Sequence, residues 1–208
     1  MGENANFYLN SKDATLFYWE VFFKEYPQLI QTVIQVFKTG ISEIRRSIIK
    51  AMPKSQKSND IPTYAEDEFS FLDKVMDDHS KLILTMMYSQ CEKALKDCLC
   101  YLGSENLDRL NCLDKLKGEF KGKHNIHLPS LPNYQHLSDY LRSLNNDIKH
   151  NGGIASKDIS PHSLYKSFRK GEAIVVENKV ILTLAENISE FMLSVIKATR
   201  DKKLCNNQ

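Results

Sequence analysis

Three polar side chains that could do chemistry recur at intervals of four residues: Arg142, Asn146 and His150. On a helix, residues four apart lie in one column. Histidine changes charge near neutral pH, so it can serve as a general acid or base. Arginine carries a permanent positive charge. The spacing therefore predicts a polar column that ends at His150, the residue of the three most suspect of a chemical role.

A helix must position this column, and the residues from Asn133 to His150 predict one. Its apolar stripe recurs at helical spacing and comprises Tyr134, Leu137, Leu141, Leu144 and Ile148. The polar column lies on roughly the opposite face. Asn151-Gly152 is a natural C-cap, because both residues tolerate the left-handed conformation that ends a helix. The helix dipole stabilises a charged histidine in the last turn by about 0.3–1 kcal/mol when it is exposed.

The run from Asn146 to Gly152 resembles the end of the signature helix of HEPN domains. These are small all-α bundles, usually dimeric, and many are metal-independent ribonucleases of toxin–antitoxin and phage-defence systems. The family pattern is an arginine, commonly followed by asparagine or another polar residue, and then a histidine after four to six intervening positions. Asn146 and His150 match this pattern. Asn145 stands where the family has its arginine, and Arg142 precedes His150 by seven intervening residues.

The resemblance implies a metal-independent endoribonuclease whose site is shared across the two-fold axis of a homodimer. In such a site His150 would act as general base or acid on a ribose 2′-hydroxyl or on the leaving oxygen, and Asn146 would position it. Arg142 or Lys149 would supply positive charge to the phosphate. The expected contacts to RNA are Lys149, Asn145 and Asn151. By the same resemblance, the expected partners are RNA, a second copy, and an antitoxin or nucleotidyltransferase.

A second hypothesis is a non-catalytic dimeric scaffold or binding domain that kept the helix end and lost the arginine. Asn145, Asn146 and His150 would then make hydrogen bonds to a ligand or to the other subunit. The direction of the Arg142 guanidinium distinguishes the two hypotheses. If it reaches the region of His150 in either chain of the dimer, catalysis is favoured, and if it points away, the scaffold is favoured.

Composition excludes several classes. The 208 residues carry a net charge of +2, so nothing global favours tight binding of nucleic acid. The five cysteines indicate reduced thiols and a cytoplasmic protein, because Cys91, Cys98 and Cys100 lie inside an apolar helical pattern. No signal peptide or apolar run of about 18 residues is evident, so no membrane is expected. Cys112, His124 and His127 fit no standard zinc spacing, so neither a metal nor a cofactor is expected.

The expected fold class is all-α, an antiparallel HEPN-like bundle of four to five main helices in a single domain over 1–208. Residues 63–198 form the core of the resemblance, 1–62 contribute N-terminal helices that pack on it, and 201–208 are a tail. Ser11 caps the first helix, in which Pro27 either makes a kink or starts a new segment. The capping box Thr63–Glu66 starts a long second helix that ends at Gly103.

The segments around the signature helix complete the expected fold. Ser104 caps a short helix through Leu116, and 117–132 form a loop. Ser160-Pro161 starts a short helix through Phe168. Residues 172–176 and 179–182 flank Glu177-Asn178 and form a small β-hairpin before the last helix. A second capping box, Thr183–Glu186, starts that last helix.

Overall fold

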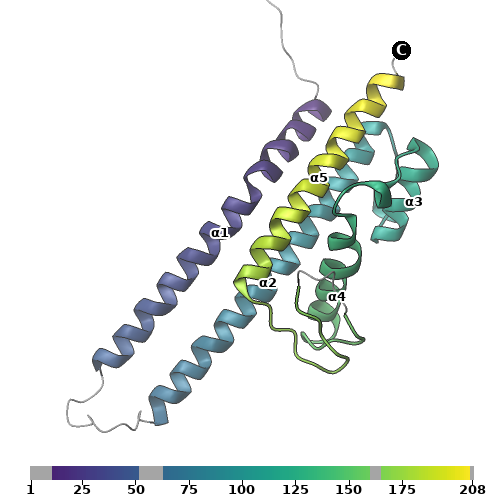
Figure 1. Ribbon diagram of the computed structural model, residues 1–208. Coiled ribbons are helices and arrows are strands. Elements are labelled where there is room, and N and C mark those ends of the chain that lie inside the picture. Colours follow the sequence, from purple (N-terminus) through teal and green to yellow (C-terminus); the bar gives the residue numbers. More distant parts are fainter. Residues whose placement is uncertain (1–10, 52–62, 160–164, 207–208) are drawn as a thin grey trace, which may run out of the picture.

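The computed structural model describes residues 11–51, 63–159 and 165–206. Its five α-helices, with the short 3₁₀ or π segments between them, are shown in Figure 1. In chain order the elements are α1 (Ser11–Ala51), α2 (Thr63–Leu102), η1 (Leu107–Arg109), α3 (Leu113–His124), η2 (Leu128–Ser130), η3 (His136–Leu141), α4 (Arg142–His150) and α5 (Asn178–Asn206). The described residues include no strand, only two isolated antiparallel bridges. The all-α class expected from the sequence is thus confirmed.

Three long helices, α1, α2 and α5, form the framework, and the shorter elements pack against one side of it (Figure 1). Each long helix buries an apolar stripe of helical period, which is what drives such helices together. In α5 this stripe is continuous and comprises Ile181, Leu184, Ala185, Ile188, Phe191, Met192, Val195 and Ile196. Cys91 and Cys98 lie buried on the facing stripe of α2, as expected, whereas Cys100 is only partly buried.

Two boundary predictions have clear outcomes. Pro27 lies inside α1, which continues through it as one helix from Ser11 to Ala51. The helix α2 begins at Thr63 and ends before Gly103, as predicted. Gly103 adopts φ +93°, and the N–H of Ser104 donates to the carbonyl of Leu99, which closes the helix end.

The helix predicted from Asn133 to His150, called the signature helix here, starts at Tyr134 and consists of η3 followed directly by α4. η3 is a π-helix, a rare form that is often found at functional sites. Leu137, Leu141 and Leu144 are buried, and Tyr134 and Ile148 pack at the edge of the core, as the stripe predicted. The helix stops at Asn151 and Gly152, and Gly152 adopts the expected left-handed conformation with φ +62°.

The predicted β-hairpin at 172–182 is wrong. Residues 179–182 form the first turns of α5, which therefore begins five residues before the predicted capping box at Thr183. The extended segment before α5 pairs with an upstream segment instead, through antiparallel bridges from Ile154 to Ala173 and from Ile159 to Phe168. A short apolar run such as 179–182 fits a strand or a buried helix equally well, and here Ile181 is buried in the helical core.

Three smaller predictions also fail. The segment 117–132 was expected to be a loop, but α3 continues to His124 within it. The short helix expected from Ser104 to Leu116 is replaced by η1 and the start of α3. The residues from Tyr165 to Phe168 are not helical, while Ser160-Pro161 lie outside the described residues. No helix in the described ranges has a stretch apolar and long enough to cross a bilayer.

Candidate functional site

A polar groove of about 520 Å³ lies beside the signature helix. One wall is the outer face of η3 and α4, and the other is the segment 157–159 that follows the helix end. The residues lining it are Ser138, Asp139, Arg142, Ser143, Asn146, Lys157, Asp158 and Ile159. Two of the three residues of the predicted column, Arg142 and Asn146, therefore share one groove.

His150 does not line this groove, although it is exposed at the end of the same helix. Residues four apart advance by 400° on a regular α-helix, so each step of the column turns it by about 40°. From Arg142 to His150 the column therefore turns by about 80° and rises by about 12 Å. The three residues recur at intervals of four in the sequence, but on the folded helix His150 faces a different direction from Arg142.

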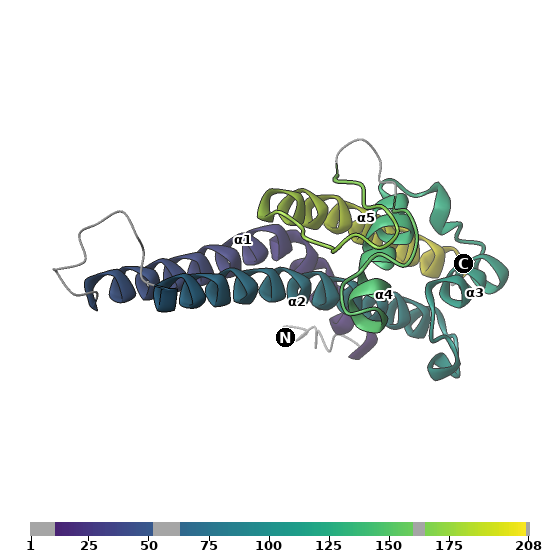
Figure 2. The ribbon, with the colours of Figure 1, turned by 90° about the horizontal axis from the view of Figure 1, so that it is seen from below.

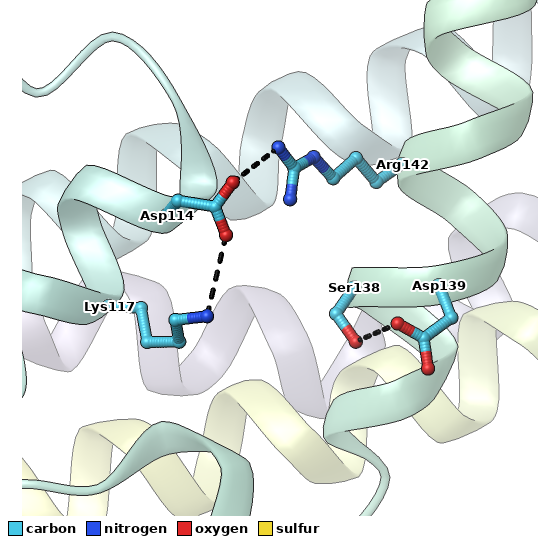
Figure 3. A network of polar contacts seen from close by, with 5 residues as sticks. All are labelled: Asp114, Lys117, Ser138, Asp139 and Arg142. Carbon is cyan, nitrogen blue, oxygen red and sulfur yellow. Dashed lines mark hydrogen bonds and ion pairs between the residues drawn. The ribbon is translucent and has the colours of Figure 1, made fainter.

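Arg142 points toward α3 and forms an ion pair there (Figure 3). Its Nη2 donates to Oδ2 of Asp114 at 2.7 Å, and Lys117 lies 3.4 Å from Oδ1 of the same carboxylate. This hydrogen bond raises the pKa of Arg142 and lowers the pKa of Asp114. The guanidinium thus already has an anionic partner 28 positions away in the sequence.

The charges that line the groove are balanced. Arg142 and Lys157 supply two positive charges, and Asp139 and Asp158 supply two negative ones. Asp139 accepts a hydrogen bond from Ser138 at 2.9 Å (Figure 3), and Asp158 accepts one from the N–H of Lys170 at 2.8 Å. A groove of this kind has no excess of positive charge for a nucleic-acid backbone.

Asp147 was not predicted as a site residue from the sequence, and its role is structural. It is only 3% exposed. Oδ1 accepts a hydrogen bond from the Asn151 amide at 2.6 Å, and Oδ2 accepts one from the N–H of Ser156 at 3.1 Å. Its carbonyl also accepts the N–H groups of Asn151 and Gly153. The spacing of Asp147 and Asn151, four apart at a helix end, was the available signal.

The electrostatics of Asp147 follow from these contacts. Burial alone would raise the pKa of its carboxyl, but the hydrogen bonds from Ser156 and Asn151 and the charge of Lys157 outweigh burial. The pKa is therefore lowered, and the group is anionic at neutral pH. This buried carboxylate fixes the loop that forms the second wall of the groove.

The predicted RNA contacts occupy different environments. Lys149 and Asn146 are exposed, while Asn151 uses its amide to bind Asp147. Asn145, at the position of the family's arginine, is only 3% exposed. Its Oδ1 has no hydrogen-bond partner among the residues that the structure describes. A charged arginine at this inward-facing position would have to be desolvated, so the position does not suit one here.

His124 also belongs to a structural contact. Its Nε2 lies 2.7 Å from Oγ of Ser104, which donates to Oε1 of Glu119 at 2.8 Å. The three residues join the end of α2 to α3, and burial lowers the pKa of His124. Among the described parts of the chain, no group of three or more His, Cys, Asp or Glu side chains could hold a metal ion.

The chain was compared with known proteins at three levels. No family model, no curated protein and no solved structure matches it.

Proposed function

We propose that this chain is a non-catalytic, HEPN-like helical scaffold. The observation that supports the proposal is the ion pair of Arg142 with Asp114, at 2.7 Å on α3. Ribonuclease chemistry would need a cation and the His150 imidazole to converge on one phosphate. Here Arg142, the only arginine of the signature helix, is paired with Asp114. It lies about 12 Å along the helix axis from His150. Asn145, at the motif position, faces inward.

The balanced charges of the groove support the same proposal. A polar groove with both signs of charge and the uncharged Ser138, Ser143 and Asn146 is suited to hydrogen bonding with a protein segment. A polyanion such as RNA would meet Asp139 and Asp158 as readily as Lys157.

Incubation with single-stranded and structured RNA, with and without a chelator, tests the proposal. We expect no cleavage by the wild type and an indistinguishable trace for His150→Ala. Asp114→Ala, which releases Arg142, should also leave RNA intact, because His150 remains distant from the guanidinium. Cleavage that persists with the chelator and disappears in His150→Ala would overturn the scaffold proposal.

A metal-independent endoribonuclease is the second candidate, and the shared groove is the observation in its favour. Arg142 and Asn146 line it together, and Lys157 lies on its opposite wall. Under this candidate, His150→Ala should reduce cleavage by about 10²–10⁴-fold, and Asn146→Ala should reduce it less. The products should carry cyclic phosphate or 3′-phosphate ends, and DNA should be resistant.

A further inference from the structure

An apolar surface that none of the described residues covers runs along α1 and α2, away from the groove. We call it the arm face and define it as Leu29, Val33, Val36 and Ile44 of α1 with Phe71, Leu82 and Met86 of α2. Each of these side chains is between 38% and 68% exposed. Leu29, Val33 and Met86 border an apolar groove of about 280 Å³ between the two helices. Exposed apolar side chains that gather in this way indicate an interaction surface.

The sequence of α1 is unusually poor in charge where it forms this face. Between residues 26 and 42 the only charged side chain is Lys38, and the other polar positions are glutamine, threonine and serine. Helix surfaces that face water normally carry charges, whereas the cores of interfaces are depleted of them. This stretch therefore has the composition of a helix that is covered on more than one side.

Gly40 lies within the same stretch of α1. A glycine inside a helix is less favourable than alanine, and a Cβ atom at Gly40 would contact none of the described residues within 4 Å. No residue that the structure describes therefore requires glycine there. A second helix that packs closely against α1 would require a residue without a side chain at this position.

The far part of α1 and α2 forms an arm that extends beyond the start of α5 (Figure 2). The buried apolar residues there, Ile41, Ala65 and Leu72, are not part of the main hydrophobic core. Two helices alone bury one stripe each, and a stable domain normally packs such a layer against another. Among the residues that the structure describes, none supplies this second layer to the arm.

We propose that a second copy of this chain supplies that layer, so that two arms form an antiparallel four-helix bundle. Charge complementarity points to this occupant. Residues 38–50 of α1 carry four basic side chains and one acidic side chain, a net charge of +3. Residues 66–78 of α2 carry six acidic side chains and one lysine, a net charge of −5. One arm thus presents both a basic helix and an acidic helix.

The charges also select the arrangement. A two-fold axis parallel to the arm places α1 of each copy against α2 of the other, so that basic and acidic stretches meet. A two-fold axis perpendicular to the arm would place the tips of the two arms at opposite ends. The basic and acidic stretches of the two copies would then not meet. In the first arrangement all neighbouring helices are antiparallel, as in an up-and-down bundle.

The arm face extends for about 22 Å along each helix, from Leu29 to Ile44 on α1 and from Phe71 to Met86 on α2. A second copy would cover it over this whole length. This dimer does not depend on what the groove beside α4 binds or cuts, so the RNA assay and the test below can fail separately.

Sedimentation at micromolar concentration is the first test. We expect the wild type to sediment at about twice its 24.0 kDa mass. Val36→Glu, at a side chain that is 68% exposed, should sediment as a folded monomer. Ile49→Glu is the matched control, because Ile49 is 56% exposed on the opposite side of α1 and should leave the dimer intact. A monomeric wild type, or equal behaviour of the two variants, would overturn the proposal.

A charge exchange identifies the partner and its orientation. Arg46→Glu with Lys50→Glu makes the α1 stretch acidic, and Asp67→Lys with Asp78→Lys makes the α2 stretch less acidic. All four side chains are exposed, and the Arg45–Asp73 pair that joins α1 to α2 within each chain is left in place. Each double variant alone should dissociate more readily, and an equimolar mixture should form a heterodimer. A mixture that associates no better than its components would contradict this arrangement.

Discussion

At the scale of single residues, Asp147 contributes more to this helix end than His150 does. Asp147 is buried, and its carboxylate accepts hydrogen bonds from the Asn151 amide and from the N–H of Ser156 that hold the following loop, whereas His150 is exposed. Asp147→Asn replaces one carboxylate oxygen, which accepts a hydrogen bond, by an NH₂ group that faces another hydrogen-bond donor. We expect a loss of about 1–3 kcal/mol in the free energy of unfolding at pH 7, measured by urea denaturation, while His150→Ala should change it by less than about 0.5 kcal/mol.

The lowered pKa of Asp147 adds a pH dependence to this prediction. A carboxyl whose pKa is lower in the folded protein stabilises it above the unfolded pKa and loses that contribution as pH falls through the folded value. The difference between wild type and Asp147→Asn should therefore be full at pH 7 and shrink below about pH 4. A difference that stays constant down to pH 2 would contradict the assignment.

The Arg142–Asp114 pair is the second prediction at this scale. Its side chains are 29% and 57% exposed, so solvent screens the pair. A double-mutant cycle with Arg142→Ala and Asp114→Ala should give a coupling of about 0.2–1 kcal/mol, falling as salt is added. Lys117→Ala, which removes the weaker neighbour at 3.4 Å, is the control and should couple less to Asp114. A coupling of zero would remove the main support for the scaffold proposal.

At the scale of elements, the end of α4 depends on two glycines that differ in a testable way. Gly152 has φ +62° with open space around it, and Gly153 has φ +79° with Lys81 Cε at 2.9 Å from where a Cβ would lie. Each substitution by alanine should cost about 1 kcal/mol through the backbone. Gly153→Ala should cost more, because it also displaces Lys81 from its ion pair with Asp77.

The Lys81→Ala background separates the two contributions to Gly153→Ala. Without the lysine, only the backbone strain remains, so the costs of Gly152→Ala and Gly153→Ala should become similar. Thermal unfolding of the four variants measures this directly. If Gly153→Ala remains the more costly substitution after Lys81 is removed, the contact with Lys81 is not the cause.

At the scale of the whole molecule, stability should be unevenly distributed along the long helices. The middle of α2 and α5 packs into the main core, whereas in the described part of the arm only one helix packs against another. In the Val36→Glu monomer, amides of residues 38–50 and 66–76 should exchange with solvent through local opening, well before those of residues 91–99 and 188–196. In the wild type at micromolar concentration, the proposed dimer should protect the arm amides. Equal arm exchange in both proteins would contradict that protection.

Much of this architecture was determined by the sequence alone, because it depends on neighbours along the chain. Apolar spacing of 3.6 residues identified α1, α2 and the signature helix, and Gly103 and Gly152 marked two helix ends. These features are local: a helix hydrogen-bonds within itself, and a residue in the left-handed conformation, usually glycine, ends it.

Only the tertiary structure decided the features that join distant segments. The run 179–182 is equally compatible with a strand and a helix until its burial against other helices is known, and it forms the start of α5. Arg142 lies in line with Asn146, but its charge is taken by Asp114 from α3. No local pattern encodes these outcomes, because each depends on which helix packs beside which.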